Sequence, residues 1–196
     1  MKKALIPVVM SSVFFCGGVM AAAADNDSSH ATLNFTGKVT SNLCQVSTTD
    51  TVKNINLGEV TKTQITSGTY RPQSFTVTLN NCDTTTNSIS YTIADNNGSA
   101  GATGQHLEPL SDDTSARGVG VFIQKSDGTA VQIGQEQSIT VQKEGTSALP
   151  QQSIALRAYI SKKAGVTDAN VSGGTVNANA TMTIKTAVAT ASPETI

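Results

Sequence analysis

The sequence predicts an all-β fold, on the evidence of its composition and of two patterns along the chain. Thr, Ser, Asn, Gly, Val and Ala are abundant, aromatic residues make up only 4%, and Trp is absent. This composition favours strands and turns over long helices. Apolar and polar residues alternate in short runs, and turn-forming residues separate these runs. Such spacing is typical of an antiparallel sandwich or barrel.

The first 24 residues have the pattern of a secretory signal peptide. Lys2 and Lys3 precede an apolar stretch that a proline interrupts, and three alanines come directly before Asp25. A membrane anchor would need about 20 uninterrupted apolar residues. We therefore expect residues 1–24 to direct export and to be removed by cleavage after Ala24.

The cysteines of the exported chain favour a disulfide. Cys16 lies in the signal peptide, so Cys44 and Cys82 remain. An even pair in an exported chain indicates a disulfide, with two free thiols as the alternative. A bridge between them would remove about 4 kcal/mol of unfolded-state entropy.

Period-two alternation places the individual strands. In the first, Leu33, Phe35, Gly37 and Val39 alternate with polar residues, which predicts a half-buried strand. The same period predicts strands at 75–80, 89–93, 138–141, 154–160 and 176–184. In the last of these, the inward positions are Val176, Ala178, Ala180, Met182 and Ile184.

A hairpin is predicted in the middle of the chain. Apolar runs at 118–124 and 129–133 flank Asp127-Gly128, which is a strong turn signal between two strands. Helix is expected only as a turn near 59–64 or 112–117.

Composition and motifs argue against catalysis, metal binding and nucleic-acid binding. The formal net charge of −1 offers no basic surface to nucleic acid. His30 and His106 have no nucleophile elbow near them, so no catalytic group is expected. His106 with Glu108, and Asp112 with Asp113, are too few ligands for a metal site and fit solvated loops better. No cofactor is expected.

Four motifs follow one another in an order that points to a known family. They are Leu33-x-Phe35-x-Gly37-x-Val39 before Cys44, Ile55-Asn-Leu57-Gly58-x-Val60, Phe75-x-Val77-x-Leu79-x-Asn81-Cys82, and Gly174-x-Val176-Asn177-Ala178-x-Ala180. In this order they resemble the chaperone-usher fimbrial subunits of the type 1 pilin family. The hairpin at 118–133 is also similar to that family's Val-Gly-Val hairpin. The resemblance covers essentially the whole exported chain.

The resemblance implies an incomplete immunoglobulin-like sandwich that lacks its last strand. Another subunit donates the missing strand, a mode of recognition that pilins are known to use. By position, residues 25–35 are the donor extension, with Ala31, Leu33 and Phe35 as its apolar residues, and residues 36–186 are the pilin domain. Residues 176–186 are then the strand that borders the acceptor groove and pairs with the chaperone, with Val176, Ala178, Ala180, Met182 and Ile184 facing the groove. Cys44 and Cys82 match the family disulfide.

The resemblance also implies partners, location and function. The expected partners are neighbouring pilin subunits, a periplasmic chaperone and an outer-membrane usher, and the expected location is a fimbria on the bacterial surface. The function is that of a structural subunit that polymerises by donor-strand exchange into a fibre for adhesion. The alternatives are a ligand-binding tip adhesin or adaptor subunit, and a free secreted immunoglobulin-like protein. Thr186 stands where the family has a tyrosine, and residues 187–196 form a polar C-terminal tail.

Overall fold

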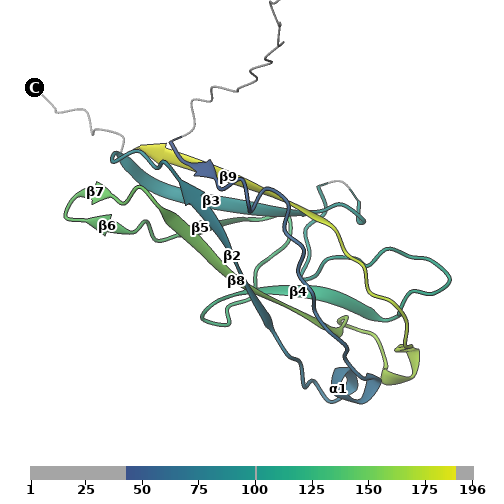
Figure 1. The fold of residues 1–196 in the computed structure, drawn as a ribbon. Coiled ribbons are helices and arrows are strands. Elements are labelled where there is room, and N and C mark those ends of the chain that lie inside the picture. Colours follow the sequence, from purple (N-terminus) through teal and green to yellow (C-terminus); the bar gives the residue numbers. More distant parts are fainter. Residues whose placement is uncertain (1–42, 100, 189–196) are drawn as a thin grey trace, which may run out of the picture. The chain divides into compact units, whose positions relative to one another are not determined.

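Two β-sheets packed face to face make up the domain, as a computed structural model of the chain shows for residues 43–99 and 101–188 (Figure 1). The larger sheet has the order β1-β2-β8-β4, and the smaller has the order β5-β3-β9. Every neighbouring pair of strands in the two sheets is antiparallel. The strands of the larger sheet are β1 (Gln45–Val46), β2 (Gln73–Asn80), β8 (Gln152–Lys162) and β4 (Val119–Lys125), and those of the smaller are β5 (Glu136–Ile139), β3 (Thr86–Asp95) and β9 (Ala180–Val188).

The core lies between the two sheets and is built from alternate residues of the strands. On β8, Ile154, Leu156, Ala158 and Ile160 are buried while most residues between them are exposed or half-buried. β3 contributes Ile89, Tyr91 and Ile93 from the other side. Because side chains point alternately to the two faces of a strand, the period-two pattern of the sequence puts these residues inside. The strands predicted at 75–80, 89–93, 118–124 and 154–160 are therefore confirmed.

The hairpin at Asp127-Gly128 forms, but its second arm is not a regular strand. Gly128 has φ +90°, and the amide of Lys125 donates to the carbonyl of Thr129 at 2.8 Å. Residues 129–133 then run beside β4 but form only one bridge with it, between Gln124 and Ala130. At the end of this segment, Ile133 bonds Gly104 instead. The predicted strand at 129–133 was wrong in this respect, because its residues divide their hydrogen bonds between two neighbours.

Two further strands differ from the prediction in their ends. β5 covers Glu136–Ile139 instead of 138–141, because its pairing with β3 runs from Glu136 opposite Thr92 to Ile139 opposite Ile89. β9 begins at Ala180 instead of Val176 and continues to Val188. Residues 175–179 precede the first pair, Asp95 with Ala180, and their carbonyls accept from loop residues. The strand predicted at 33–39 lies outside the described residues, as do the predicted signal peptide and donor extension.

Helix is confined to short turns in the described ranges. α1 (Lys62–Thr66) begins after Thr61, whose hydroxyl and backbone form a capping box with Gln64. It matches the turn expected near 59–64, whereas 112–117 is a non-helical turn. The short helix η1 (Asp168–Asn170) and the hairpin of β6 (Lys143–Glu144) and β7 (Ser147–Ala148) were not predicted. Among these residues, no helix has the length and apolar character needed to cross a membrane.

Candidate functional site

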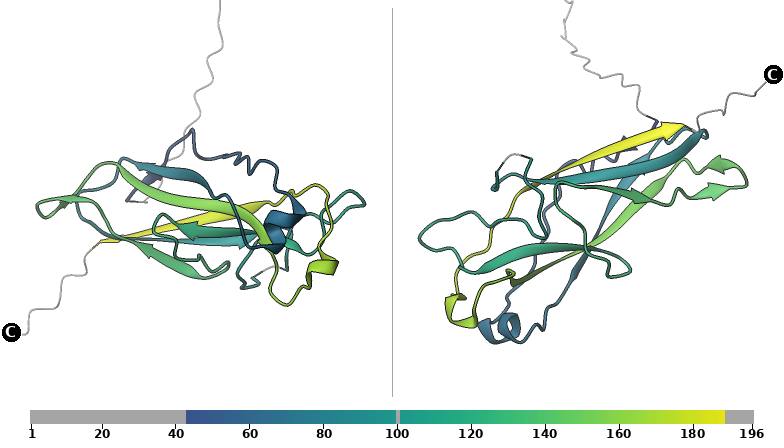
Figure 2. Two further views of the ribbon diagram at one scale, coloured as in Figure 1. Left: turned by 90° about the horizontal axis from the view of Figure 1, so that it is seen from below. Right: turned by 180° about the vertical axis from the view of Figure 1, so that it is seen from behind.

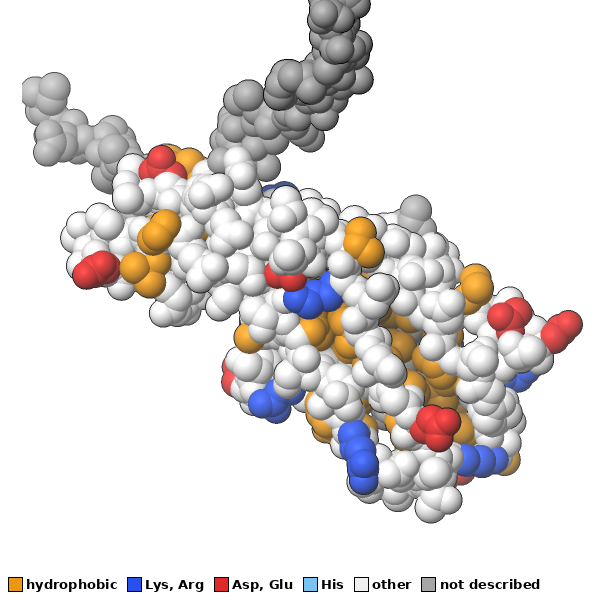
Figure 3. Space-filling model, viewed as in Figure 1, with side chains coloured by type: hydrophobic (Ala, Val, Ile, Leu, Met, Phe, Trp, Pro, Cys, Tyr) orange, Lys and Arg blue, Asp and Glu red, His pale blue; other side chains and the backbone are white. Residues whose placement is uncertain are grey.

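An open apolar groove of about 1260 Å³ lies beside β9. Its second wall is the segment of residues 53–60, which we call the rim. Figure 3 shows apolar side chains exposed in this hollow. The floor belongs to the core of the sandwich and includes Val77, Ile93, Val121, Ile123, Ala158 and Ile160. Part of the hydrophobic core is therefore open to solvent.

β9 turns apolar side chains toward the groove but does not bury them. Val176, Ala178, Met182 and Ile184 are half-buried, and Ala180 is exposed. Their neighbours on β3 are much better covered, since Tyr91 and Ile93 are only 1% and 4% exposed. If another strand completed the sandwich along this edge, the apolar side chains of β9 would be as well buried as those of β3. The structure thus brings together the five residues that the sequence selected, although only the last three lie within β9.

The backbone of β9 is also open on the groove side. β9 is the last strand of its sheet, with β3 on one edge. The amide of Asn96 donates to the carbonyl of Asn179 at 2.9 Å, so odd-numbered residues bond toward β3. In an antiparallel ladder the alternate residues point their N–H and C=O groups to the other edge. Among the described residues, the even-numbered positions from Ala180 to Thr186 therefore have no backbone partner on the groove side, where apolar side chains lie beside them.

The rim borders the groove without joining either sheet. Within the described ranges, residues 53–60 make no backbone-to-backbone hydrogen bond. Leu57 and Val60 are half-buried against the core, and Ile55 is 36% exposed. Both walls of the groove thus offer apolar contacts, and both have free backbone groups. This arrangement can accept one extended strand.

Charged side chains hold the start of the rim. Lys53 Nζ lies 2.6 Å from Asp50 Oδ1 and 2.5 Å from the carbonyl oxygen of Thr76. The other carboxylate oxygen of Asp50 accepts from the amide of Thr78 at 2.7 Å. The hydrogen bond from Lys53, followed by the one from Thr78, holds the pKa of Asp50 below its ordinary value. Asp50 is therefore ionised at neutral pH.

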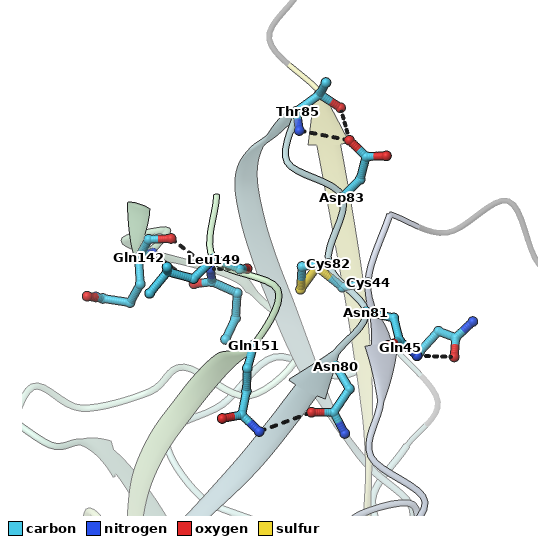
Figure 4. Close-up of a disulfide and its surroundings, with 11 residues drawn as sticks. Cys44, Gln45, Asn80, Asn81, Cys82, Asp83, Thr85, Gln142, Leu149 and Gln151 are labelled. Atoms are coloured by element: carbon cyan, nitrogen blue, oxygen red, sulfur yellow. Dashed lines mark hydrogen bonds between the residues drawn. A yellow bond between two sulfur atoms is a disulfide. The ribbon is translucent and has the colours of Figure 1, made fainter. Parts of the chain in front are cut away.

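The Cys44–Cys82 disulfide is present, which confirms the expected pairing over two free thiols. It joins the residue before β1 to the chain just after β2, and both cysteines are 6% exposed. Figure 4 shows it beside the hydrogen bond from Gln151 to Asn80, at 3.1 Å. The disulfide therefore closes a loop that contains the whole rim.

The residues considered as metal ligands form ion pairs and turns instead. His106 Nε2 lies 3.0 Å from Glu108 Oε1, and Lys163 pairs with the other oxygen of Glu108. Burial alone would raise the pKa of Glu108, but the bonds from Lys163 and His106 outweigh it and lower that pKa. Asp112 accepts from Thr114 and Ser115 within its turn. The described part of the chain holds no group of three or more metal-ligating side chains.

Sequence reasoning missed two features around the site. The first is the contact of Asp50 and Lys53 with β2, which no spacing rule predicts because their partners are backbone atoms 23 and 28 residues away. The second is a row of rings on the outer face of the larger sheet, formed by Tyr70, Tyr159, Phe122 and His106, which we call the aromatic row. The only signal for this row in the sequence is that Phe122 and Tyr159 occupy outward-facing positions of their strands.

The sandwich with one open edge has the fold of pilus subunits of the chaperone-usher type. The chain matches the crystal structure of the P pilus rod subunit PapA with a TM-score of 0.59 at 18% identity, covering 74% of this chain and 99% of that one. It matches a subunit in the structure of a chaperone-usher pilus with a TM-score of 0.57 at 20% identity, covering 80% and 95%. These likenesses confirm the incomplete immunoglobulin-like fold.

The chain belongs to the Fimbrial protein family, whose model matches residues 33–186. It is also 47% identical to the fimbrial protein 987P of Escherichia coli over 190 residues, which cover 95% of this chain and 97% of that protein. The protein is thus a structural subunit of surface fimbriae that assembles with other pilins, and it is not an enzyme. The prediction made from the four sequence motifs is confirmed.

Proposed function

We propose that the groove accepts residues 25–35 of a neighbouring subunit as its missing strand, and that repetition of this step builds the fibre. The supporting observation is the coincidence of backbone groups on β9 that have no partner among the described residues with an apolar groove between β9 and the rim. An incoming strand would pair with β9 and cover the open core in one step.

The donor extension has the spacing that the groove requires. Ala31, Leu33 and Phe35 are two residues apart, so in an extended strand they point to the same side. That side would face the floor of the groove, where burial of each large apolar side chain contributes about 1.5–3 kcal/mol. Polar residues between them would face solvent.

Export and assembly follow from the same proposal. Residues 1–24 direct the chain to the periplasm, where a chaperone pairs with β9 and fills the groove until an outer-membrane usher exchanges it for a donor extension. The chaperone is required because a free edge beside apolar surface promotes aggregation. Residues 187–196 follow the pilin domain as a tail, of which Ala187 and Val188 still belong to β9.

A peptide of residues 25–38 tests the central step. When it is added to the chain from Asp25 onward, the melting temperature should rise with peptide concentration, by an amount equivalent to about 2.7 kcal/mol at one hundred times the dissociation constant. A matched peptide with Leu33→Asp and Phe35→Asp should have no effect. A stable monomer that ignores both peptides would contradict donor-strand acceptance.

Deletion of the extension gives a second test. A chain that lacks residues 25–34 should still bind the peptide but should end a fibre, because it has a groove and no donor. Fibre length measured by electron microscopy should fall as this variant is mixed with the full chain. Unchanged fibre length would show that the donor lies elsewhere.

A further inference from the structure

The free edge of β2 is occupied by two charged side chains instead of a strand. β1 pairs with β2 only at Gln45 with Asn80 and at Val46 with Leu79, and Ser47 N then donates to Thr78 O at 2.8 Å. Immediately afterwards the chain turns, with the amide of Asp50 donating to the carbonyl of Ser47. The edge of β2 before Thr78 therefore loses its partner strand.

Asp50 and Lys53 replace that strand with side-chain atoms. The carboxylate of Asp50 takes the Thr78 N–H at 2.7 Å, and the ammonium of Lys53 donates to the Thr76 carbonyl at 2.5 Å. The two side chains also bond each other at 2.6 Å. The Asp50 side chain is only 8% exposed, whereas the Lys53 side chain is 34% exposed. Hydrogen bonds with one charged partner are stronger than neutral ones.

Without these contacts, the chain that follows β1 could pair with the edge of β2. If β1 continued in its register, residues 47–52 would lie opposite residues 73–78 of β2. In the structure the rim instead stands away from β2, and an opening of about 410 Å³ separates residues 53–56 from residues 73–76. The rim is left beside the groove, where Ile55 and Leu57 line it.

We propose that Asp50 and Lys53 form a clamp that positions the rim and closes the edge of β2 to pairing, so that an incoming strand is directed to β9. This inference rests on the proposed function of the groove as a strand acceptor. Both side chains act as positioning residues for the rim through their bonds to β2, and both also line the groove at its border. The clamp also explains why the rim can border the groove with no backbone pairing of its own in the described ranges.

Substitution of the clamp tests the inference. Lys53→Met keeps most of the stem and removes the ammonium, and Asp50→Ala removes the carboxylate. Each should weaken binding of the peptide of residues 25–38 on the order of tenfold, because the rim then loses its fixed position. Lys53→Arg, which keeps the positive charge, should retain most of the affinity for the peptide. Lys143→Met is the matched control, since Lys143 bonds only Asn87 at 2.9 Å and does not line the groove.

Hydrogen exchange gives a second readout, because it distinguishes a local change in pairing from a loss of overall stability. In the double variant Asp50→Ala/Lys53→Met, amides of residues 48–52 should become more protected, as the chain extends its pairing with β2. Lower protection everywhere would instead indicate general destabilisation and would contradict the clamp.

The outcomes separate the clamp from the function on which it rests. If the unsubstituted chain does not bind the peptide, the proposed function is wrong and the clamp has no role in it. If the unsubstituted chain binds the peptide and the clamp variants bind equally well with unchanged exchange at residues 48–52, the clamp is wrong and the function stands.

Discussion

Gln152 shows how a single buried side chain can replace a stretch of strand pairing. It is 1% exposed, and its amide accepts from Gln142 N at 2.8 Å while donating to the carbonyls of Gln142 at 2.8 Å and Leu149 at 3.0 Å. This one side chain thus joins the two ends of the loop between β5 and β8, beside the backbone bond from Leu149 to Gln142. Sequence could not reveal this, because a glutamine at the start of a strand usually faces solvent.

Gln152→Leu should therefore be strongly destabilising even though leucine is apolar and similar in size. The amide of Gln142 and the carbonyl of Leu149 would lose their partner, whereas the carbonyl of Gln142 would keep the amide of Leu149. We expect this loss to lower the free energy of unfolding by about 1–3 kcal/mol. Urea denaturation measures the change. The neighbouring Gln151→Leu, at an exposed position, should stay within about 0.5 kcal/mol, and an equal loss in both variants would refute the argument.

The burial of Tyr91 predicts that the free energy of unfolding falls at alkaline pH. Its ring is 1% exposed, its hydroxyl has no partner among the described residues, and burial followed by the charge of Asp127 raises its pKa from 10.0 to about 12. Between these two values the unfolded chain loses the proton and the folded chain keeps it, so stability falls as pH rises through this window. Burial also raises the pKa of Tyr159, which adds to the fall.

Tyr91→Phe should reduce this alkaline fall at little cost. Since the hydroxyl makes no hydrogen bond, its removal should change the free energy of unfolding at pH 7 by less than about 1 kcal/mol. Urea titrations at pH 7 and at several values from 9 to 11 compare the two proteins. A large loss at pH 7 would mean that the hydroxyl has a partner, such as a buried water.

Among the elements, the loop after α1 is held to the larger sheet by the aromatic row. The rings of Tyr70 and Tyr159 stack with centroids 4.1 Å apart, and Tyr159 in turn lies 5.6 Å from Phe122. Tyr70→Ala should cost about 0.5–1.5 kcal/mol more than Tyr70→Phe, which keeps the stack. Thermal unfolding of both variants measures the difference, and equal effects would show that the ring contact contributes nothing.

For β9, the two faces of the strand should respond differently to charge. Ala180 lines the groove but is exposed, so Ala180→Asp should leave the subunit folded and yet weaken peptide binding more than tenfold by placing a charge against an apolar strand. Thr183→Asp is the control, because Thr183 is exposed and does not line the groove. Isothermal titration with the peptide of residues 25–38 measures both. Equal effects of the two substitutions would contradict the assigned orientation.

Elements were predictable from the sequence where burial on one face enforces a period of two. β2, β3 and β8 each have such a face, and the sequence located all three, whereas β4 was located by its apolar run before Asp127-Gly128. The ends of β9 were not predictable, because Val176 and Ala178 continue the alternation beyond the last residue of β3 that can pair with them. Their pattern reflects the groove that they line and not a strand partner.

At the scale of the whole domain, the disulfide and the groove affect the same part of the chain. The bridge spans 38 residues, and these include β1, the clamp, the rim, α1 and all of β2. The part of this region between β1 and β2 forms one wall of the groove but contributes few backbone bonds to the sheets. The Cys44–Cys82 disulfide therefore restricts the conformations of this region in the unfolded and partly folded chain.

The last prediction concerns the loss of this bond. Replacing both cysteines, Cys44→Ser with Cys82→Ser, should lower the free energy of unfolding by about 4 kcal/mol, because a loop of this length is no longer closed in the unfolded chain. Neither cysteine lines the groove, so the loss should be nearly the same with and without bound peptide. Urea denaturation with both proteins, each with and without the peptide of residues 25–38, measures the four free energies. If peptide binding restored most of the lost stability, the disulfide would act by shaping the groove wall, and the loop-closure account would be wrong.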